Sequence, residues 1–162
     1  SGVNEASISA SARRKVEIFI AGEAIAKGDF VALNFAETAD GEKGLVVKKA
    51  DVADTDTICL VGVALEEATA GEVANNQTKK ISVCVGGLVD GANVGGSVVK
   101  GDRLVASATA GRADTAAKFR TDLGDGTGTT TGTVAQQQQI IAIACEDDAV
   151  NKALVYVFPH TP

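Results

Sequence analysis

The tripeptide Lys-Gly-Asp occurs twice, at residues 27–29 and again at residues 100–102. A lysine and a carboxylate held close together could bind a ligand or transfer a proton. A turn explains these residues more simply, because glycine adopts the backbone angles of a turn and aspartate accepts backbone hydrogen bonds. We therefore predict four structural turn residues: Gly28, Asp29, Gly101 and Asp102.

Nucleophiles and metal ligands are sparse along the chain. The single histidine, His160, lies close to the C-terminus, and the three cysteines at positions 59, 84 and 145 are far apart. We interpret these cysteines as buried thiols that behave as small apolar side chains, because no C-x-x-C spacing is present. No serine or cysteine has a credible base, because the single histidine lies in a predicted tail, so we expect no catalytic residue, no metal site and no cofactor.

Two carboxylate clusters and one glycine-rich tract are candidate binding sites. Residues 51–56 and 146–148 lack the spacing of a calcium-binding EF-hand loop, so solvated turns are expected, with weak Ca²⁺ or Mg²⁺ binding as an alternative. The Gly/Thr tract at residues 124–133 matches neither a Walker loop nor a dinucleotide fingerprint, so it predicts a flexible loop.

Composition excludes several classes of partner. The chain has 162 residues, a net charge of -6 and only 4% aromatic residues, which disfavours nucleic-acid binding. No apolar stretch approaches the roughly 20 residues that span a membrane, so no membrane partner is expected. The chain starts at Ser1 without a signal-peptide pattern, as expected of a product made in the cytoplasm that has lost its initiator Met.

Short apolar runs separated by turn residues predict strands rather than helices. A short helical turn is expected over residues 51–56, and turns are expected at Asp40-Gly41, Asp90-Gly91 and Ala110-Gly111. The predicted strands are Lys15–Ile20, Phe30–Phe35, Leu45–Lys48, Ile58–Glu66, Lys80–Val85, Arg103–Ser107, Gln139–Glu146 and Ala153–Phe158.

Three blocks of sequence repeat in the same order. Residues 27–29 recur 73 positions later, residues 61–67 recur 80 positions later, and residues 80–85 recur 72 positions later. This predicts an internal duplication. The expected fold is all-β: a compact barrel or β-clip-like domain over residues 15–162, made of two similar halves at about 15–87 and 88–158.

An extended N-terminal arm is expected over residues 1–14. Its first twelve residues carry too few apolar side chains to order themselves, and a basic run follows. We predict that the arm contacts a protein partner through five residues, although the basic run is also explained as the solvated start of a strand: Val3, Ile8, Arg13, Arg14 and Lys15.

The repeated blocks resemble small tailed-phage capsid decoration (cement) proteins. The residues that carry the likeness are 26–31, 61–72 and 81–87, followed by a second Gly-Asp turn at 101–102 and a closing strand at 153–157. The resemblance covers roughly residues 16 to 158. It implies a non-catalytic β protein that binds the outside of an icosahedral head, commonly as a homotrimer, with the major capsid protein as its partner.

Three functions are therefore open on sequence alone. The first is a structural virion protein that stabilises the capsid by bridging shell subunits on its outer surface. The second is a binding or adhesion module that displays the Gly/Thr tract to a host glycan or protein, although sugar sites usually stack on aromatic rings. The third is a small hydrolase or lyase with a carboxylate site.

Overall fold

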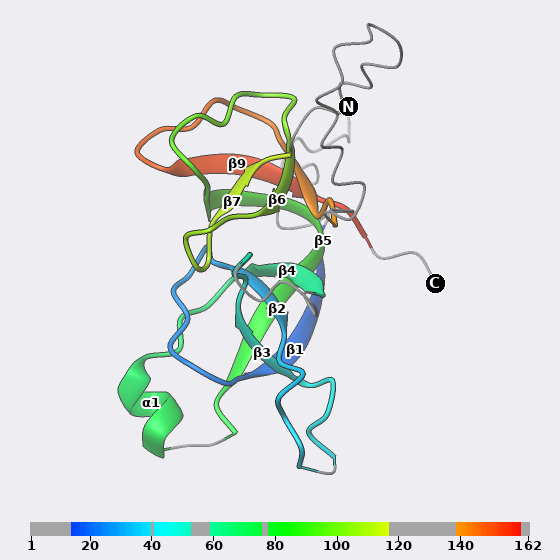
Figure 1. Ribbon diagram of the computed structural model, residues 1–162, viewed down its shortest axis with the longest axis vertical. Coiled ribbons are helices and arrows are strands. Elements are labelled where there is room, and N and C mark those ends of the chain that lie inside the picture. Colours follow the sequence, from blue (N-terminus) through cyan, green and yellow to red (C-terminus); the bar gives the residue numbers. More distant parts are fainter. Residues whose placement is uncertain (1–13, 40, 53–58, 76–77, 117–138, 160–162) are drawn as a thin grey trace, which may run out of the picture.

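The computed structural model describes residues 14–39, 41–52, 59–75, 78–116 and 139–159, which form strands and one short helix (Figure 1). The all-β prediction is confirmed. The elements are β1 (Lys15–Ala21), β2 (Phe30–Leu33), β3 (Val46–Lys49), β4 (Leu60–Ala64), α1 (Ala70–Asn75), β5 (Lys80–Asn93), β6 (Arg103–Ala106), β7 (Ala113–Thr115), β8 (Ala142–Ala144) and β9 (Lys152–Val157).

The first half of the chain closes into a five-stranded ring, which we call barrel 1. Its strands follow the order β1-β3-β2-β4-β5, and β1 also pairs with β5, which closes the ring. The β1–β3 pair is parallel, with Ile20 opposite Val46, and the other pairs are antiparallel. Closure leaves no free sheet edge in this ring.

The second half forms a matching ring, barrel 2, above barrel 1 in Figure 1. Its strands follow the order β5-β9-β8-β6-β7, all in antiparallel pairs. A single parallel bridge between Val94 and Ala113 connects the end of β5 to β7 and completes the ring.

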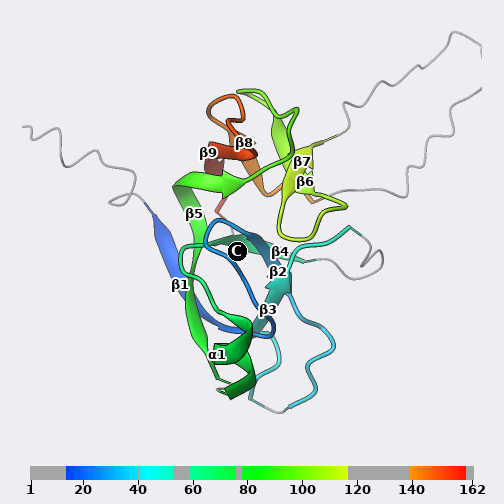
Figure 2. The ribbon, with the colours of Figure 1, turned by 90° about the vertical axis from the view of Figure 1, so that its left-hand side faces the viewer.

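Strand β5 belongs to both barrels and runs through the length of the body (Figure 2). It pairs with β1 up to Gly86 and with β9 from Gly87 onward. The turn predicted at Asp90-Gly91 is wrong: these residues lie inside β5, where the register shifts between Val89 and Ala92 and Gly91 has a φ of 73°. Asp-Gly here makes a β-bulge, a kink within a strand, rather than a reversal of the chain.

The strand registers of the two barrels match each other. Phe30 lies opposite Val63 in barrel 1, and Arg103 lies opposite Ile143 in barrel 2. Phe30 and Arg103 are 73 residues apart along the chain, and Val63 and Ile143 are 80 apart, the same offsets as the sequence repeats. The pair Ala64 and Val83 of barrel 1 has its counterpart in the pair Ala144 and Val155 of barrel 2, at offsets of 80 and 72 residues.

Two apolar clusters form the core. One lines barrel 1 and includes Phe19, Val31, Val47 and Ile81. The second cluster contains the side chains that line barrel 2 and those that point outward from β2, β4 and β5. The outside of barrel 1 therefore packs into barrel 2. The barrel 1 members of this cluster are Phe30, Ala32, Ala50, Leu60, Val63 and Cys84, and its barrel 2 members include Leu104, Ile141, Val155 and Val157.

Several predicted elements differ from the structure. Helix α1 was missed because none of its residues is buried, so it carries no apolar stripe. Strand β7 was missed because it has only three residues. The predicted strands 30–35, 58–66 and 139–146 are longer than β2, β4 and β8, and most of the predicted turn at 51–56 lies outside the described residues. Among the described residues, no helix is long and apolar enough to cross a membrane.

Candidate functional site

The two Lys-Gly-Asp turns have the same local geometry. Gly28 and Gly101 have φ angles of 93° and 89°, in the left-handed region that favours glycine. The Asp29 carboxylate accepts a hydrogen bond from the Ala26 N–H at 2.8 Å, and Asp102 accepts one from the Val99 N–H at 3.0 Å. Each aspartate therefore closes its own turn across three residues.

The surroundings of the two turns differ. Asp29 is buried and also accepts a hydrogen bond from the Asn93 amide, whose oxygen accepts one from Lys152. A Cβ atom at Gly28 would lie 2.6 Å from the Gly91 carbonyl oxygen, whereas a Cβ at Gly101 would meet nothing within 4 Å. The first turn is thus packed between the barrels, and the second faces open space.

The described part of the predicted arm ends at the joint between the barrels. Val3, Ile8 and Arg13 lie outside the described residues. Arg14 Nε donates a 2.7 Å hydrogen bond to the Leu88 carbonyl, and Lys15 lies opposite Gly86 in the β1–β5 pair. The basic run therefore meets the body where β5 passes from one barrel to the other.

A pocket of about 340 Å³ opens at one end of barrel 1, which we call the mouth of barrel 1. Lys15 and Glu17, whose charged groups lie 3.9 Å apart, contribute to its lining from β1. The rest of the lining is mostly apolar: Phe19, Leu33, Gly44, Cys59, Leu60, Val61 and Val85. A mostly apolar hollow with one charged pair at its border can bury an apolar group.

An apolar surface lies on the outside of barrel 2. Leu88, Tyr156 and Ile143 lie opposite one another across β5, β9 and β8, and so share one face of the sheet. Tyr156 is 39% exposed, and its ring meets Phe158 edge-on at 6.0 Å between ring centroids. Leu88 and Ile143 are half-buried beside this exposed ring, and an apolar surface of this kind is a candidate interaction surface.

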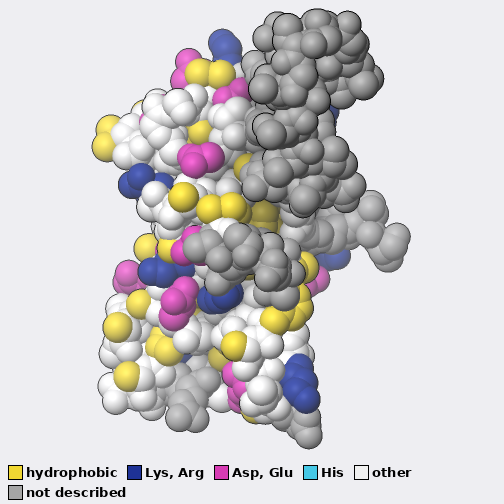
Figure 3. All heavy atoms as spheres, viewed as in Figure 1, with side chains coloured by type: hydrophobic (Ala, Val, Ile, Leu, Met, Phe, Trp, Pro, Cys, Tyr) yellow, Lys and Arg dark blue, Asp and Glu magenta, His cyan; other side chains and the backbone are white. Residues whose placement is uncertain are grey.

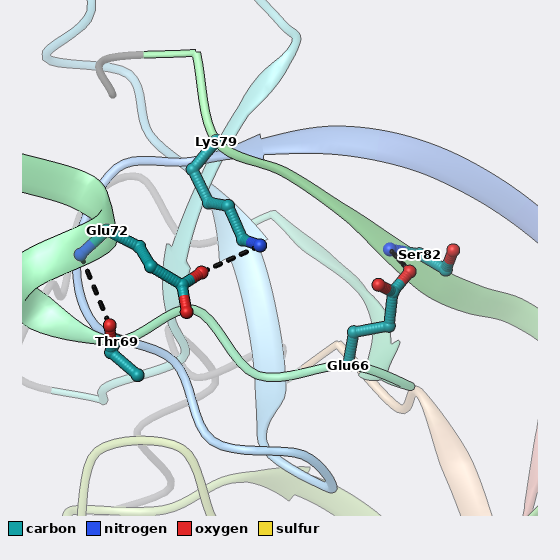
Figure 4. Close-up of polar contacts among 5 residues, drawn as sticks. All are labelled: Glu66, Thr69, Glu72, Lys79 and Ser82. Atoms are coloured by element: carbon teal, nitrogen blue, oxygen red, sulfur yellow. Dashed lines mark hydrogen bonds and ion pairs between the residues drawn. The ribbon is translucent and has the colours of Figure 1, made fainter. Parts of the chain in front are cut away.

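A polar cluster connects helix α1 to strand β5 (Figure 4). The Thr69 hydroxyl accepts a hydrogen bond from the Glu72 N–H at 3.2 Å, and the Glu72 carboxylate pairs with Lys79 at 2.7 Å. The hydrogen bond that the Lys79 ammonium donates to the Glu72 carboxylate raises the pKa of Lys79. Hydrogen bonds from Ser82 lower the pKa of Glu66. Every carboxylate here has a partner in the fold, so the cluster fixes the helix rather than offering a free acid or base.

The cysteine prediction holds for one of the three residues. Cys84 is buried, its thiol lies 3.2 Å from the Gly86 carbonyl oxygen, and burial raises its pKa. Cys145 is exposed and Cys59 is half-buried in the mouth of barrel 1, so the prediction of buried thiols is wrong for both. Cys59 and Cys145 lie just outside β4 and β8, where their side chains are not fully covered.

The carboxylates at residues 146–148 hold backbone N–H groups. Glu146 accepts a hydrogen bond from Leu154, Asp147 from Lys100 and Asp148 from Asn151, at 2.7, 2.9 and 3.2 Å. Within the described ranges, no three histidine, cysteine or acidic side chains are placed to hold a metal ion. Asp54, Asp56 and the Gly/Thr tract at 124–133 lie outside those ranges.

These features define an all-β protein of two fused barrels whose candidate site is a pair of surfaces. No family model matches the chain, and no curated protein matches it. The mouth of barrel 1 and the outside of barrel 2 were both missed as sites in the sequence. The repeat could have revealed them, because aligning the halves sets the exposed Tyr156 against the buried Cys84.

Proposed function

We propose that this chain is a structural virion protein that binds the outer surface of an icosahedral phage capsid and stabilises it by bridging shell subunits. Its partner is the major capsid protein, and it acts as a homotrimer without catalysis or a cofactor. It is made in the host cytoplasm and resides on the capsid surface.

The observation that carries this proposal is the position of the residues behind the resemblance to decoration proteins. Residues 26–31 form the first Gly-Asp turn and the start of β2, residues 61–72 include most of β4, and residues 81–87 lie in β5. These segments hold barrel 1 together, and equivalent segments build barrel 2. The likeness therefore lies in the repeated framework rather than in scattered surface residues.

The position of the first described residues, Arg14 and Lys15, supports a bridging role. Arg14 and Lys15 fix the start of the described chain at the joint between the barrels, so a segment entering there can reach a partner beside either barrel. Each exposed ion pair contributes only about 0–1 kcal/mol. Repeated weak contacts by every copy on a lattice raise the overall attachment strongly.

The charge distribution is consistent with a protein partner. On the face shown in Figure 3, acidic and basic side chains alternate over the described residues. Nucleic-acid binding draws most of its affinity from clustered lysine and arginine contacts with phosphates. A mixed surface with a net charge of -6 suits protein contacts better.

The test is binding to undecorated phage heads. The full chain and a version that lacks residues 1–12 are mixed with the heads, and bound protein per head is measured. We expect saturable binding of the full chain, weaker occupancy by the truncated chain, and unchanged circular dichroism, because the arm carries little apolar area. Equal occupancy would remove the arm from the interface, and absence of binding by the full chain would contradict the proposed function.

A further inference from the structure

Within one chain, the outside of barrel 1 is covered by barrel 2. Phe30, Val63 and Cys84 point outward from β2, β4 and β5, and each is 0% exposed. They lie in one apolar cluster with Leu104 and Val155 from the interior of barrel 2. The outer wall of one barrel therefore fills the mouth of the other.

The duplicated wall on barrel 2 has no such cover from the described residues. The matching registers place Arg103, Ile143 and Tyr156 at the positions of Phe30, Val63 and Cys84. Tyr156 is 39% exposed, Arg103 is exposed and Ile143 is half-buried. We call this row the outer wall of barrel 2.

No described residue fills the duplicated mouth on barrel 1 either. Ile141 and Val157, which lie in the cluster at the filled mouth of barrel 2, correspond by the same offsets to Val61 and Val85. Val61 and Val85 line the open pocket of about 340 Å³. Within one chain, the outer wall of barrel 1 fills the mouth of barrel 2. The described residues of the outer wall of barrel 2 and of the mouth of barrel 1 do not contact each other.

We propose that the outer wall of barrel 2 docks on the mouth of barrel 1 of a second copy of this chain, head to tail. Tyr156 and Ile143 supply the apolar contact, and Arg103 faces the carboxylate of Glu17 at the pocket border. The two surfaces differ, so the contact is heterologous, and repetition closes a ring when the rotation permits. This contact forms with or without a shell to bind.

Side chains supply most of this contact. Inside the chain, the Asn93 N–H donates to the Gly28 carbonyl, and the Phe30 N–H donates to the Gly111 carbonyl, both at 2.8 Å. The equivalent groups of barrel 1 already bond to each other, from the Ile20 N–H to the Leu45 carbonyl at 2.8 Å. The contact between copies is therefore weaker than the one within the chain and responds to single side-chain changes.

The test uses two variants that each remove one surface. Tyr156→Glu places a charge on the wall, and Leu33→Lys places one at the mouth, where Leu33 is half-buried. Ile143→Ser is a second wall variant in case Tyr156→Glu fails to fold. Val150→Asn is the control, because Val150 is 92% exposed in the β8–β9 turn, and asparagine tolerates its φ of 54°.

Sedimentation velocity of the full chain and variants gives the answer. We expect the unmodified chain and Val150→Asn to form the same oligomer, and each surface variant alone to weaken self-association by at least about tenfold. An equimolar mixture of Tyr156→Glu and Leu33→Lys is expected to form a dimer, because one intact wall then meets one intact mouth. A monomeric unmodified chain, unchanged association of a folded surface variant, or a mixture that stays monomeric would each overturn the proposal.

Discussion

Barrel 1 and barrel 2 share a framework but differ at one pair of strands: β1 with β3 in barrel 1, and the end of β5 with β7 in barrel 2. In barrel 1, β1 and β3 pair at two successive positions, Ile20↔Val46 and Ala21↔Val47. In barrel 2, the corresponding seam holds one bridge, Val94↔Ala113. The neighbouring groups of Asn93 and Gly111 bond instead to Gly28 and Phe30 of barrel 1.

This difference shows what a duplicated unit must keep and what it can change. The strand register and the turn aspartates persist, because each satisfies backbone groups inside its own barrel. The outward residues diverge, because each wall meets a different environment. Phe30 is buried between the barrels and its counterpart Arg103 is exposed, so their contributions to stability should differ most.

The largest expected effect is from truncating that buried wall residue. Phe30→Ala removes a fully buried ring from the cluster that joins the barrels and should cost about 3–5 kcal/mol of unfolding free energy. The matched variant Arg103→Ala should change it by about 0.5 kcal/mol or less in the monomer. Denaturant unfolding at low protein concentration measures both, and similar losses would mean that the two walls are equivalent.

The second largest difference between the barrels is expected when each turn glycine is replaced by alanine. Gly28→Ala should lose more stability than Gly101→Ala. Both variants incur the strain of a positive φ, about 1–2 kcal/mol. Gly28→Ala also drives its Cβ to 2.6 Å from the Gly91 carbonyl oxygen, which should add about 1–3 kcal/mol. Thermal unfolding of Gly28→Ala and Gly101→Ala gives the comparison, and an equal shift in Tm would argue against close packing at the first turn.

The turn aspartates should show a smaller difference. Asp29→Ala leaves the Ala26 N–H and the Asn93 amide without their acceptor in a buried site and should cost about 1–3 kcal/mol. Asp102→Ala loses bonds from Val99 and Thr115 closer to solvent, so water can replace them and the cost should be about 0.5–1.5 kcal/mol. Urea unfolding distinguishes the two, and a larger loss in Asp102→Ala would reverse the assigned environments.

The smallest expected effect is a pH dependence in barrel 1. Hydrogen bonds from the Ser82 side chain and backbone lower the pKa of Glu66 below its ordinary value of 4.5. A carboxylate with a lower pKa in the folded state stabilises the fold above its unfolded pKa, and this stabilisation is lost as pH falls through the folded pKa. Glu66→Gln should therefore be less stable than the unmodified chain at pH 7. The difference in unfolding free energy between the two should narrow below about pH 4.5.

The control for this pH effect is Glu67→Gln, at an exposed neighbouring position. It removes a neighbouring carboxylate and leaves the Ser82 hydrogen bonds to Glu66 in place. If the difference in unfolding free energy between Glu66→Gln and the unmodified chain stays constant from pH 7 to pH 3, the Ser82 hydrogen bonds do not favour the charged form of Glu66.

The sequence predicted the framework because the framework repeats. The Lys-Gly-Asp turns and the apolar strands recur at offsets that the strand registers reproduce. Signals without repetition were weaker. Asp90-Gly91 reads locally as a turn, and only its pairing with β9 makes it a bulge. The Thr69 cap of α1 was the available sign of a helix with no buried face.

The candidate surfaces could not be predicted from one strand at a time. Tyr156 belongs to an apolar run, and the sequence alone does not say which neighbour covers each side of β9. The pocket at the mouth of barrel 1 combines residues from β1, β2, β4 and β5, which come together only when the ring closes. Long-range pairing, rather than local composition, creates both surfaces.

The reactivity of Cys145 tests the central comparison most directly. Cys145 is exposed in the single chain, and its counterpart by the repeat, Leu65, packs against the cluster between the barrels. At a concentration where the chain is assembled, we expect a maleimide to label Cys145 several-fold more slowly in the unmodified chain than in Tyr156→Glu, with Cys84 unreactive in both. Equal labelling rates at Cys145 would contradict the account, because the outer wall of barrel 2 would then be free in the assembled protein.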